Sequence, residues 1–599
     1  MERMRGSRWT ARVRSENEVF EHALMDATTP GEIDAMTAEF ETDAKFCELD
    51  SAWAIEGTTR INVYPQPGGE YEWSWMNDKR TNAADLDVAG GIVVYSYMKG
   101  DKYEIKAVRR EKHLWTHGAS VHGVGPSVAI VGRRVYLLEA SGPHQYDSLV
   151  SLDLNGKDRQ VHYEERNESA GLELIRGENG CLFLLSDNSG RQKLFHMGER
   201  LKRLSPEASV FFPVGFAPNS KEPCYFTLGT SWEAHGTALE SYRLPAAHGI
   251  DAMILRNGVF IHREHGQRFV DLCGRRRGPK RLAKIFGEVL VHPWNLWQGR
   301  TGPVDLVIHV PGQSPVRGEI RDCMKLSTPR FVYAANSLTG MAASADGTRV
   351  RWVSVCAGEP KAVIVVGYGA YNTPTHLDTA RWKPFIERGF AIAFACVRGG
   401  GDHDDAWAKA AQVHNKARSV EDFEACIRAV QRGLGLGPAK TCIFGRSAGG
   451  YLVGMAAVRH PDGDLFGSIY TEVPYVDVLK TASNSRLPLT KYEYLEFGDP
   501  RHVIADFETL LRLGPVSGLG PRGAPGIFVI CRAGLKDKQV YAYESMKWID
   551  VLRGDAAPDE ICVESKLLSI SHEGHFTKGP GVFGERARDF LLLSKRILS

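Results

Sequence analysis

A serine flanked by glycines stands where a strand-like run gives way to a helix-prone one. The segment Gly445-Arg446-Ser447-Ala448-Gly449-Gly450 follows the apolar run 441–444 and precedes the run 451–458. In a nucleophile elbow, such a turn holds the serine hydroxyl clear, and its glycines let strand and helix pass close by. Backbone N–H groups at the helix N-terminus can then stabilise an oxyanion. Ser447 is therefore the candidate nucleophile, and an ordinary glycine-rich turn is the alternative interpretation of so short a pattern.

A serine hydroxyl needs a base within reach and a carboxylate that orients the base. In α/β-hydrolases the acid and then the histidine follow the serine, each on a loop after a later strand. Asp537 follows the strand-like run 526–531, and His575 follows the run 561–565. We therefore expect Asp537 to orient His575 as the base for Ser447.

Two alternatives stay open for these residues. His572 could serve as the base in place of His575, and Asp537, between Lys536 and Lys538, could be a surface turn residue. His572 and His575 could also form a metal pair, but no HExxH spacing or further ligand cluster accompanies them. We accordingly expect no metal site and no cofactor.

The elements that must position these side chains alternate in type beyond about residue 326. This alternation predicts a doubly wound, mainly parallel sheet of the α/β-hydrolase kind, with functional loops at the carboxyl ends of the strands. Strand-like runs lie at 362–366, 390–394, 441–444, 468–473, 526–531 and 561–565, and helices are expected near 380–387, 420–432, 543–552 and 584–597.

From about residue 50 to 325 the chain repeats a different unit: an apolar alternating run, a Gly/Asn/Asp turn and a second run. The pairs 91–97 with 103–107 and 181–185 with 193–196 are examples. Strands that recur with a period of roughly 40 residues are typical of a β-propeller. No sharp repeat motif is present, so the repeat alone does not set the number of blades.

Composition limits the classes of partner. The chain has 599 residues, and its 74 Lys and Arg nearly balance 72 Asp and Glu, which gives no support to nucleic acid or an anionic membrane as a partner. No apolar run is long enough to span a membrane. The eleven cysteines are scattered without zinc spacing, as expected of buried thiols in a reducing compartment. We expect a soluble, cytoplasmic protein.

A series of short motifs stands in order along the C-terminal part of the chain: Tyr368–Tyr371, Val397–Gly401 with Trp407, Asn415-Lys416, Asp422-Phe423, Gly445–Gly450, Asp464–Gly467, Val473–Asp477, Leu487–Thr490, Glu496–Pro500, Gly534–Asp537 and Gly574-His575. With these motifs, residues 361–597 resemble the catalytic domain of the prolyl oligopeptidase family of serine peptidases, nearest to its oligopeptidase B branch. The resemblance implies that the repeat region is a seven-bladed propeller over the active site, and that the chain divides into 1–45 packed on the hydrolase domain, 46–325 and 326–599.

The resemblance also implies roles at the site. The Tyr368 hydroxyl would join the backbone N–H of Ala448 in an oxyanion hole, and Tyr371 would form an aromatic wall of the primary specificity pocket. A phenol donor aimed at a developing alkoxide is worth on the order of 3 kcal/mol in the transition state. Both tyrosines could instead be packed aromatic residues.

The chain departs from the family where specificity is set. Prolyl-specific members have a tryptophan in the segment that matches 484–497, and this chain has none. The oligopeptidase B branch has paired acids there that bind arginine or lysine. Glu493 matches the first acid, whereas Leu495 stands at the second, next to Glu496. One buried carboxylate can still select a basic side chain, and a helix-surface glutamate is the alternative.

Two further departures from the family lie beside the candidate catalytic residues Ser447 and Asp537. Gln539 stands where prolyl-specific relatives have an arginine, and we count it among the substrate-binding residues. Arg446 replaces the small residue that often precedes the serine, and it adds positive charge near the site.

These observations together predict a serine oligopeptidase that cleaves short peptides through an acyl-enzyme, after Arg or Lys. The partners would be short peptides, with no nucleic acid and no membrane, and the protein would be a monomer or homodimer. An esterase, isopeptidase or peptide cyclase with the same machinery is one alternative. A catalytically idle propeller that binds other proteins is a second.

Overall fold

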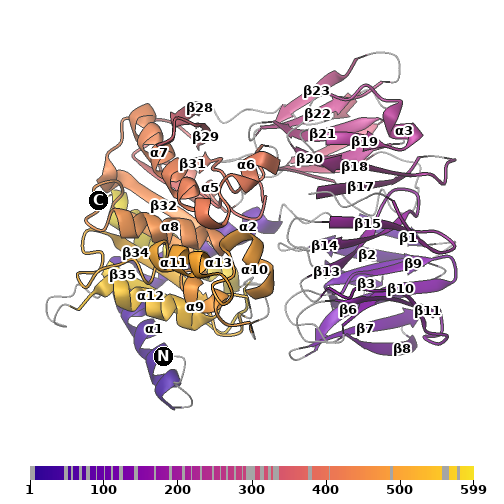
Figure 1. Cartoon of the computed structure of the whole chain (residues 1–599), viewed down its shortest axis with the longest axis horizontal. Helices are drawn as coiled ribbons and strands as arrows, with labels where there is room; N and C mark the ends of the chain where they lie inside the picture. The colour runs from indigo at the N-terminus through magenta and orange to yellow at the C-terminus, as the bar shows by residue number, and fades with distance from the viewer. Residues whose placement is uncertain are drawn as a thin grey trace.

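The protein, described here from a computed structural model, consists of an all-β body beside an α/β body (Figure 1). The structure describes residues 7–598 apart from the segments 46–50, 56–58, 66–70, 76–80, 90, 100–101, 110–111, 120–125, 141–145, 168–169, 188–191, 205–209, 218, 229–231, 246–248, 256–257, 265–266, 275–277, 286–287, 292–303, 310–315, 322–324, 328–335, 376–380, 404, 486, 488–489, 538, 556–564 and 576–580.

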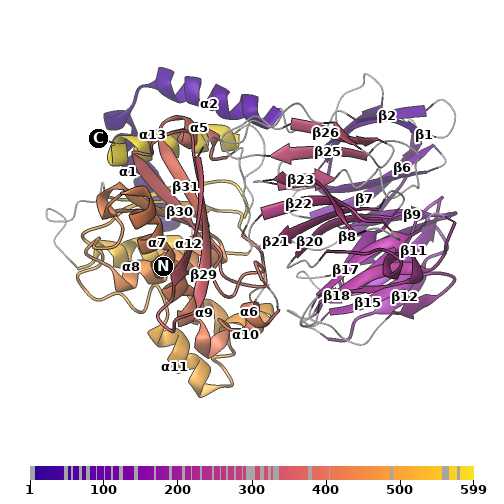
Figure 2. The same ribbon diagram turned by 90° about the horizontal axis from the view of Figure 1, so that it is seen from above.

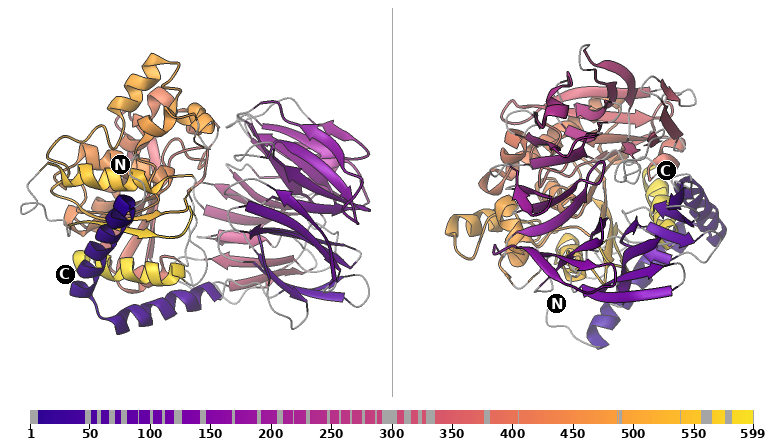
Figure 3. Two further views of the ribbon diagram at one scale, coloured as in Figure 1. Left: turned by 90° about the horizontal axis from the view of Figure 1, so that it is seen from below. Right: turned by 90° about the vertical axis from the view of Figure 1, so that its right-hand side faces the viewer.

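Among the described residues, the all-β body contains seven antiparallel sheets in chain order, each built from consecutive strands. Figures 2 and 3 place the first sheet beside the last, so the sheets follow one another around a ring. The expected seven-bladed propeller is therefore confirmed. The strands are β1–β4 (Ser51–Ile55, Thr59–Pro65, Tyr71–Trp75, Thr81–Ala83), β5–β8 (Asp85–Ala89, Ile92–Lys99, Lys102–Arg109, Lys112–Ala119), β9–β12 (Val128–Val131, Arg134–Glu139, Ser148–Asp153, Gln160–Glu164), β13–β16 (Gly171–Arg176, Leu182–Asp187, Gln192–Met197, Leu201–Arg203), β17–β19 (Val210–Phe216, Pro223–Leu228, Trp232–His235), β20–β23 (Gly249–Ile254, Val259–Glu264, Gln267–Leu272, Lys280–Ile285) and β24–β27 (Glu288–Val291, Val304–His309, Val316–Arg321, Lys325–Ser327).

Apolar side chains fill the space between neighbouring blades. One cluster joins Val94 and Ile105 of the second sheet to Val135 and Val150 of the third. Because a middle strand contacts a blade on each side, its residues are buried on both faces, as in β14, where Leu182 and Phe183 are both fully buried. The propeller core is thus a series of layers between sheets, and not one central core.

The α/β body contains an eight-stranded sheet in the order β28-β29-β31-β30-β32-β33-β34-β35. The first three strands pair antiparallel, and the remaining pairs are parallel, which confirms the mainly parallel sheet. The strands are β28 (Asn336–Ala343), β29 (Arg349–Cys356), β30 (Ala362–Val366), β31 (Phe390–Ala395), β32 (Thr441–Arg446), β33 (Ser468–Glu472), β34 (Phe528–Gly534) and β35 (Lys566–Ser571).

Helices cover both faces of this sheet. Along β30, Val363 and Val365 face one apolar cluster, whereas Ala362 and Ile364 face the other, because strand side chains alternate. Helices α7, α8 and α12 contribute to the first cluster, and α1, α2, α5 and α13 to the second. The helices are α1 (Ser7–Ala27), α2 (Pro30–Lys45), α3 (Thr237–Glu240, in the propeller), α5 (Lys383–Glu387), α6 (Asp405–Lys409), α7 (Ala417–Leu434), α8 (Ala448–Arg459), α9 (Val478–Ala482), α10 (Thr490–Phe497), α11 (Ile504–Arg512), α12 (Ala542–Arg553) and α13 (Gly581–Leu598), and the short 3-10 turns are Val413–Asn415 and Pro438–Lys440.

One strand differs from the sequence expectation. The run 561–565 was predicted as the strand before the histidine, but the strand that pairs with β34 is Lys566–Ser571, and residues 561–564 lie outside the described part of the chain. Its register explains the shift, since Leu567 and Ile570 are buried when Lys566 pairs with Val529. The run 561–563 is equally apolar, so the pattern alone did not separate the two.

The N-terminal helices lie against the α/β body. Phe20 and Leu24 of α1 and Met36 of α2 are buried in the cluster that covers one face of the sheet. Asn17 binds the outer edge of β35 twice, because its Nδ2 donates to the carbonyl of Ile570 (2.9 Å) and its Oδ1 accepts from the N–H of the same residue (2.8 Å). This side chain occupies an edge position that a further strand would otherwise fill.

The eight described cysteines are buried thiols without a disulfide. Among the described residues, no helix combines the length and the apolar character needed to cross a bilayer.

Candidate active site

Ser447 occupies a strained turn between β32 and α8. Its backbone has φ 54° and ψ −120°, in the left-handed half of conformational space that a serine rarely adopts. Three main-chain bonds hold it there. The Ser447 N–H donates to the carbonyl of Glu472 (3.1 Å), and the Ser447 carbonyl accepts from Tyr475 (2.9 Å) and Gly450 (2.8 Å). The turn is therefore fixed by β33 and by the first turn of α8.

The glycines of the elbow allow this close approach. A Cβ atom on Gly445 would lie 2.0 Å from the carbonyl oxygen of Gly449, and one on Gly449 would lie 2.7 Å from the carbonyl oxygen of Gly367. Both distances are shorter than any real contact of a methyl group. Side chains at these two positions would push α8 away from β32 and from the segment after β30, so the glycines are required by packing.

Asp537 and His575 form a hydrogen-bonded pair on the loops that follow β34 and β35. His575 Nδ1 lies 2.8 Å from Asp537 Oδ2, and both residues are buried. The other carboxylate oxygen, Oδ1, accepts the N–H groups of Gln539 (2.8 Å) and Val540 (2.9 Å). The carboxylate is therefore held at both oxygens, and it sets the direction of the imidazole ring.

Main-chain bonds join the two loops. Lys536 N–H donates to the carbonyl of Glu573 (2.9 Å), and Leu535 N–H donates to the carbonyl of Ser571 (2.9 Å). His572, the alternative base, is exposed, whereas His575 is turned inward toward Asp537. The geometry thus favours His575 over His572.

The loop of His575 is also tied to the nucleophile elbow. The Nη2 of Arg446, the residue before Ser447, donates to the backbone carbonyl of His575. Arg446 is the last residue of β32, and His575 follows β35, three strands away in the sheet. The side chain therefore joins the ends of the two strands that carry the candidate nucleophile and the candidate base.

Tyr368 lies beside the elbow at the carboxyl end of β30. A Cβ atom on Gly449 would be 3.5 Å from both Cα and Cδ2 of Tyr368, which places the ring against the first turn of α8, where Ala448 lies. Burial raises the pKa of the Tyr368 hydroxyl, and the negative charges of Glu493 and Glu496 raise it further. The phenol stays protonated and can donate a hydrogen bond at neutral pH.

The chain reverses its direction across the sheet between β30 and β32. Strand β31 lies on one side of β30, whereas β32 lies on the other, so the loops after β30 and β32 diverge. Such a switch point is where ligands bind in open α/β sheets. Tyr368 and Ser447 both follow strands at this point.

Helix α10 brings Glu493 and Glu496 to the segment that follows Tyr368. The Tyr371 hydroxyl donates to Glu493 Oε2, and the Tyr371 N–H donates to Glu496 Oε2 (3.1 Å). Tyr371 has φ 56° and remains 37% exposed, so these two bonds hold a strained residue at a surface that a ligand can reach. Figures 1 and 2 show α10 on the side of the α/β body that faces the propeller.

The two glutamates of α10 are in different electrostatic states. Lys416 Nζ donates to Glu496 Oε1, and both residues are only 2% exposed, which makes them a buried ion pair. Burial raises the pKa of Glu493 to about 7, the Tyr371 hydrogen bond lowers it, and the charge of Glu496 raises it again. Glu493 is therefore the carboxyl group still able to bind a cation, while Glu496 already has one.

Gln539 lies apart from α10. Its N–H donates to Asp537 Oδ1 (2.8 Å), so its place is on the loop of the candidate acid. The structure brings together Tyr371, Glu493 and Glu496 as one group and Asp537, His575 and Gln539 as another. Arg446 and Tyr368 connect the elbow of Ser447 to these groups.

Sequence reasoning missed several residues that support the site. Glu472 ends β33 in a run that read only as an apolar strand, and Arg381 donates to both of its carboxylate oxygens. A charged residue within an apolar strand must find a partner, and that was the available signal. Lys416 was noted only in the family resemblance, and nothing near it in sequence indicates its pairing with Glu496.

This arrangement has the parts that acyl transfer requires. A strained serine stands at a helix N-terminus, a buried His–Asp pair lies on adjacent loops, and a protonated phenol lies against the elbow. Among the described residues, no group of three or more His, Cys, Asp or Glu side chains is placed to hold a metal ion.

Comparison with known proteins finds peptidase relatives for the C-terminal part of the chain. Residues 375–596 match the profile of the Prolyl oligopeptidase family. "Protease 2" of Moraxella lacunata is 31% identical over 217 residues, which cover 36% of this chain and 31% of that protein. "Uncharacterized peptidase y4sO" of Sinorhizobium fredii is 31% identical over 259 residues, which cover 41% and 36%. The matched segment thus spans about a third of the length of these curated relatives.

Solved structures match over nearly the whole chain. Oligopeptidase B from Trypanosoma brucei, in a closed form with covalently bound antipain, has a TM-score of 0.78 at 18% identity, covering 99% of this chain and 93% of that one. Oligopeptidase B from Leishmania major has a TM-score of 0.77 at 17% identity, covering 99% and 92%. At this level of identity the likeness shows the fold, an α/β-hydrolase sheet with a propeller.

Proposed function

We propose that the protein is a serine peptidase that hydrolyses short peptides through an acyl-enzyme, because residues 375–596 match the profile of the Prolyl oligopeptidase family. Ser447 attacks the carbonyl carbon of the peptide bond, and the amine leaves. Water then releases the acyl group and restores the serine.

The His575–Asp537 hydrogen bond is the observation that supports this proposal most strongly. When Nδ1–H donates to the carboxylate, Nε2 carries the lone pair that would accept the proton of the Ser447 hydroxyl. The same nitrogen, now protonated, gives its proton to the leaving amine. The buried Asp537 carboxylate stabilises the imidazolium that forms between these two steps.

We propose Tyr368 and Ala448 as the oxyanion donors. The tetrahedral intermediate places negative charge on the former carbonyl oxygen, and donors already in position stabilise that charge. The Ala448 N–H is the first of α8, and the Tyr368 ring lies against the first turn of that helix. The raised pKa of Tyr368 favours the protonated phenol that this role needs.

The propeller would limit the size of the substrate. We propose the division into 1–45, 46–325 and 326–599, with the second boundary moved past β27 (Lys325–Ser327), which belongs to the last propeller sheet. In this division the propeller faces the loops of the α/β body and admits short peptides. The placement of α10 on the propeller side supports this division (Figures 1 and 2). The buried thiols support a cytoplasmic location.

We propose a preference for Arg or Lys on the acyl side of the cleaved bond. Glu493 and Tyr371 would bind the basic side chain of the substrate. The cation would stabilise the ionised carboxylate of Glu493, which is buried away from water. Two solved structures with this fold are named oligopeptidase B.

The direct test is covalent labelling. A fluorophosphonate probe should label the wild-type protein at Ser447, and Ser447→Ala should abolish labelling and peptide hydrolysis. Ser517→Ala, at an exposed serine of the same body, serves as the matched control and should label normally. An unlabelled wild type, or a labelled Ser447→Ala variant, would refute the proposal.

A substrate panel then tests the specificity. Peptide amides that end in Arg, Lys, citrulline or Pro, together with a simple ester, are compared by kcat/KM. Arg and Lys amides should be the best substrates. Hydrolysis of the ester alone would make the protein an esterase of the same fold, and a faster reaction after Pro would contradict the Glu493 pocket.

A further inference from the structure

Arg446 has two partners on different strands. Its Nη2 donates to the main-chain carbonyl of His575, and its Nε lies 3.4 Å from Glu472 Oε2. The side chain leaves β32 directly before Ser447. One guanidinium group therefore contacts the loop of the candidate base from a residue next to the candidate nucleophile.

Glu472 gives this guanidinium a fixed anchor. Both carboxylate oxygens of Glu472 accept hydrogen bonds from Arg381, and the Tyr470 hydroxyl donates to Oε1 (3.0 Å). Although burial favours its protonated form, the charges of Arg381 and Arg446 hold the pKa of Glu472 well below its usual value. The glutamate therefore remains an anion at any physiological pH.

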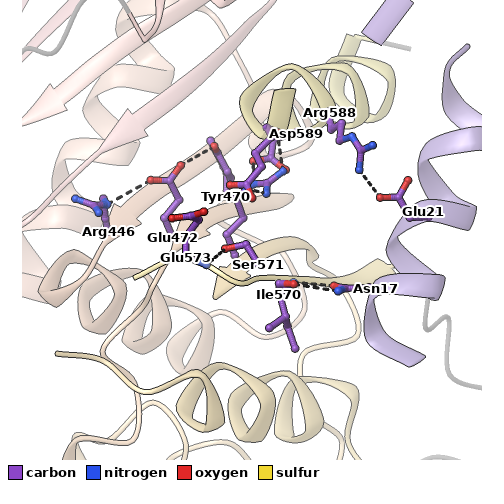
Figure 4. A network of polar contacts seen from close by, with 12 residues as sticks. Asn17, Glu21, Arg446, Tyr470, Glu472, Ile570, Ser571, Glu573, Arg588 and Asp589 are labelled. Atoms are coloured by element: carbon purple, nitrogen blue, oxygen red, sulfur yellow. Dashed lines mark hydrogen bonds and ion pairs between the residues drawn. The ribbon is translucent and has the colours of Figure 1, made fainter. Parts of the chain in front are cut away.

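The anchor continues into the core of the α/β body. Figure 4 shows Glu472 with Arg446 on one side and Tyr470 on the other, and Asp589 of α13 beyond. Asp589 is fully buried and pairs with Arg532 of β34. Because these partners come from β33, β34 and α13, Arg446 is anchored to elements that are packed together in the α/β body.

The His575 loop is held by main-chain bonds at Ser571 and Glu573 and by side chains at His575 itself. The residues between the end of β35 and His575 form neither a helix nor a strand. Asp537 orients the imidazole ring, and Arg446 holds the main chain of the same residue. The hydrogen bond from a guanidinium group to a carbonyl oxygen is charge-assisted, and it is stronger than a hydrogen bond between two neutral groups. Ring direction and main-chain position are thus controlled separately.

We propose that Arg446 is a positioning residue, which sets the distance from the imidazole of His575 to the hydroxyl of Ser447 through its bond to the His575 carbonyl. Asp537 aims the ring, and Arg446 places it over the serine. Proton transfer between the two requires a heavy-atom distance near that of a hydrogen bond, so a small displacement of the loop slows acylation strongly. This inference rests on the proposed function.

The test compares variants at position 446. Arg446→Met keeps the length of the side chain and removes every donor, and we expect kcat to fall about tenfold to a hundredfold, with KM for a peptide amide unchanged. Arg446→Lys keeps one cationic donor and should recover part of the loss. Arg446→Gly restores a small residue, and added ethylguanidinium should raise its kcat while leaving the wild type unaffected.

Two controls separate positioning from general stability. Arg459→Met removes an arginine at the other end of α8 that pairs with Glu424, and its kcat should equal that of the wild type. Arg381→Met removes a partner of Glu472 on the side away from Arg446. If Arg446 acts only through the stability of this network, Arg381→Met and Arg446→Met will lower kcat and the unfolding temperature in parallel.

Each outcome of these experiments either supports or overturns the inference. A lower kcat with rescue by lysine or ethylguanidinium supports the inference. An unchanged kcat in Arg446→Met, a parallel loss in Arg381→Met, or no rescue overturns it. In each of these cases the wild-type protein still labels at Ser447, whereas an unlabelled wild type would reject the peptidase proposal itself. If Arg446→Met does not fold, Arg446→Lys and the rescue of Arg446→Gly decide.

Discussion

Lys416 and Glu496 form a buried ion pair next to Tyr371, whose hydroxyl binds Glu493. The same ammonium group also donates to the carbonyl of Gly369 (3.0 Å), next to Tyr368, and the same carboxylate accepts the N–H of Tyr371. The pair therefore connects α10 to the segment that carries the candidate oxyanion donor. The pair also explains why Glu493 and Glu496 of α10 differ, since Lys416 neutralises the charge of Glu496.

Loss of this lysine should be costly. Lys416→Met leaves an unpaired buried carboxylate, so we expect the free energy of unfolding to fall by about 3–5 kcal/mol. Arg428→Met removes an exposed partner of Glu424 at 3.8 Å and should change it by less than about 1 kcal/mol. Urea unfolding followed by tryptophan fluorescence measures both. Equal effects of the two substitutions would show that Glu496 is not held by Lys416.

The proposed preference for basic substrates should depend on pH. Burial raises the pKa of Glu493 to about 7, so the carboxyl is mostly protonated below that pH and mostly anionic above it. The ratio of kcat/KM for an arginyl amide to that for its neutral citrulline counterpart should therefore increase as pH rises through 7. Any effect of pH on the acylation chemistry is common to both substrates and cancels in the ratio.

The matched variant is Glu493→Gln. It keeps an acceptor for the Tyr371 hydroxyl and removes the titration, so the ratio should be low and flat with pH. A ratio that still rises in Glu493→Gln would assign the charge recognition to another residue.

The acid of the pair should matter through the tautomer of His575. Asp537→Asn can donate a hydrogen bond to Nδ1, which moves the ring proton to Nε2, where it blocks acceptance of the serine proton. We expect kcat to fall by about 10⁴-fold, with the fold retained. Asp462→Asn, at an exposed surface aspartate, provides the comparison and should leave kcat unchanged. A loss below tenfold for Asp537→Asn would remove Asp537 from the triad.

Gly450 offers a test of the elbow packing. A Cβ atom there would lie 2.3 Å from Cβ of Pro474, so Gly450→Ala must push α8 away from the turn after β33. Alanine would otherwise stabilise a helix relative to glycine, and a lower unfolding temperature with reduced kcat would therefore report the clash. Gly358→Ala has no heavy atom within 4 Å of the new methyl group and should be neutral. Stabilisation by Gly450→Ala would contradict this packing.

Much of the fold follows from local patterns. Periodic apolar runs predicted several elements to within a few residues of where the structure has them. Examples are the strands at 362–366 and 390–395 and the helix at 417–434. The run 561–565 was predicted as the strand before the histidine, but residues 561–564 lie outside the described part of the chain, and the strand that the structure shows there is Lys566–Ser571. Its place depends on pairing with β34, and pairing is a property of the assembled sheet.

The candidate site could likewise be predicted only in part from the sequence. The elbow around Ser447 and the order of Asp537 and His575 could be predicted, because a strand, a turn and a helix are contiguous in the chain and the order of loops follows the order of strands. The pairing of Lys416 with Glu496, 80 residues apart, could not, and neither could the contact of Arg446 with His575, 129 residues away. Nothing in the residues around Arg446 distinguishes it from a surface arginine.

The amino-acid sequence thus determined by itself the two kinds of element, their order and the residue types able to carry out acyl transfer, since these depend on short-range periodicity and turn chemistry. Only the tertiary structure decided which charges meet. It gives Glu496 a lysine, leaves Glu493 with a raised pKa and brings Arg446 to the loop of His575. The physical reason is that the energy of a charge is set by burial and by neighbours from distant strands, which local sequence does not specify.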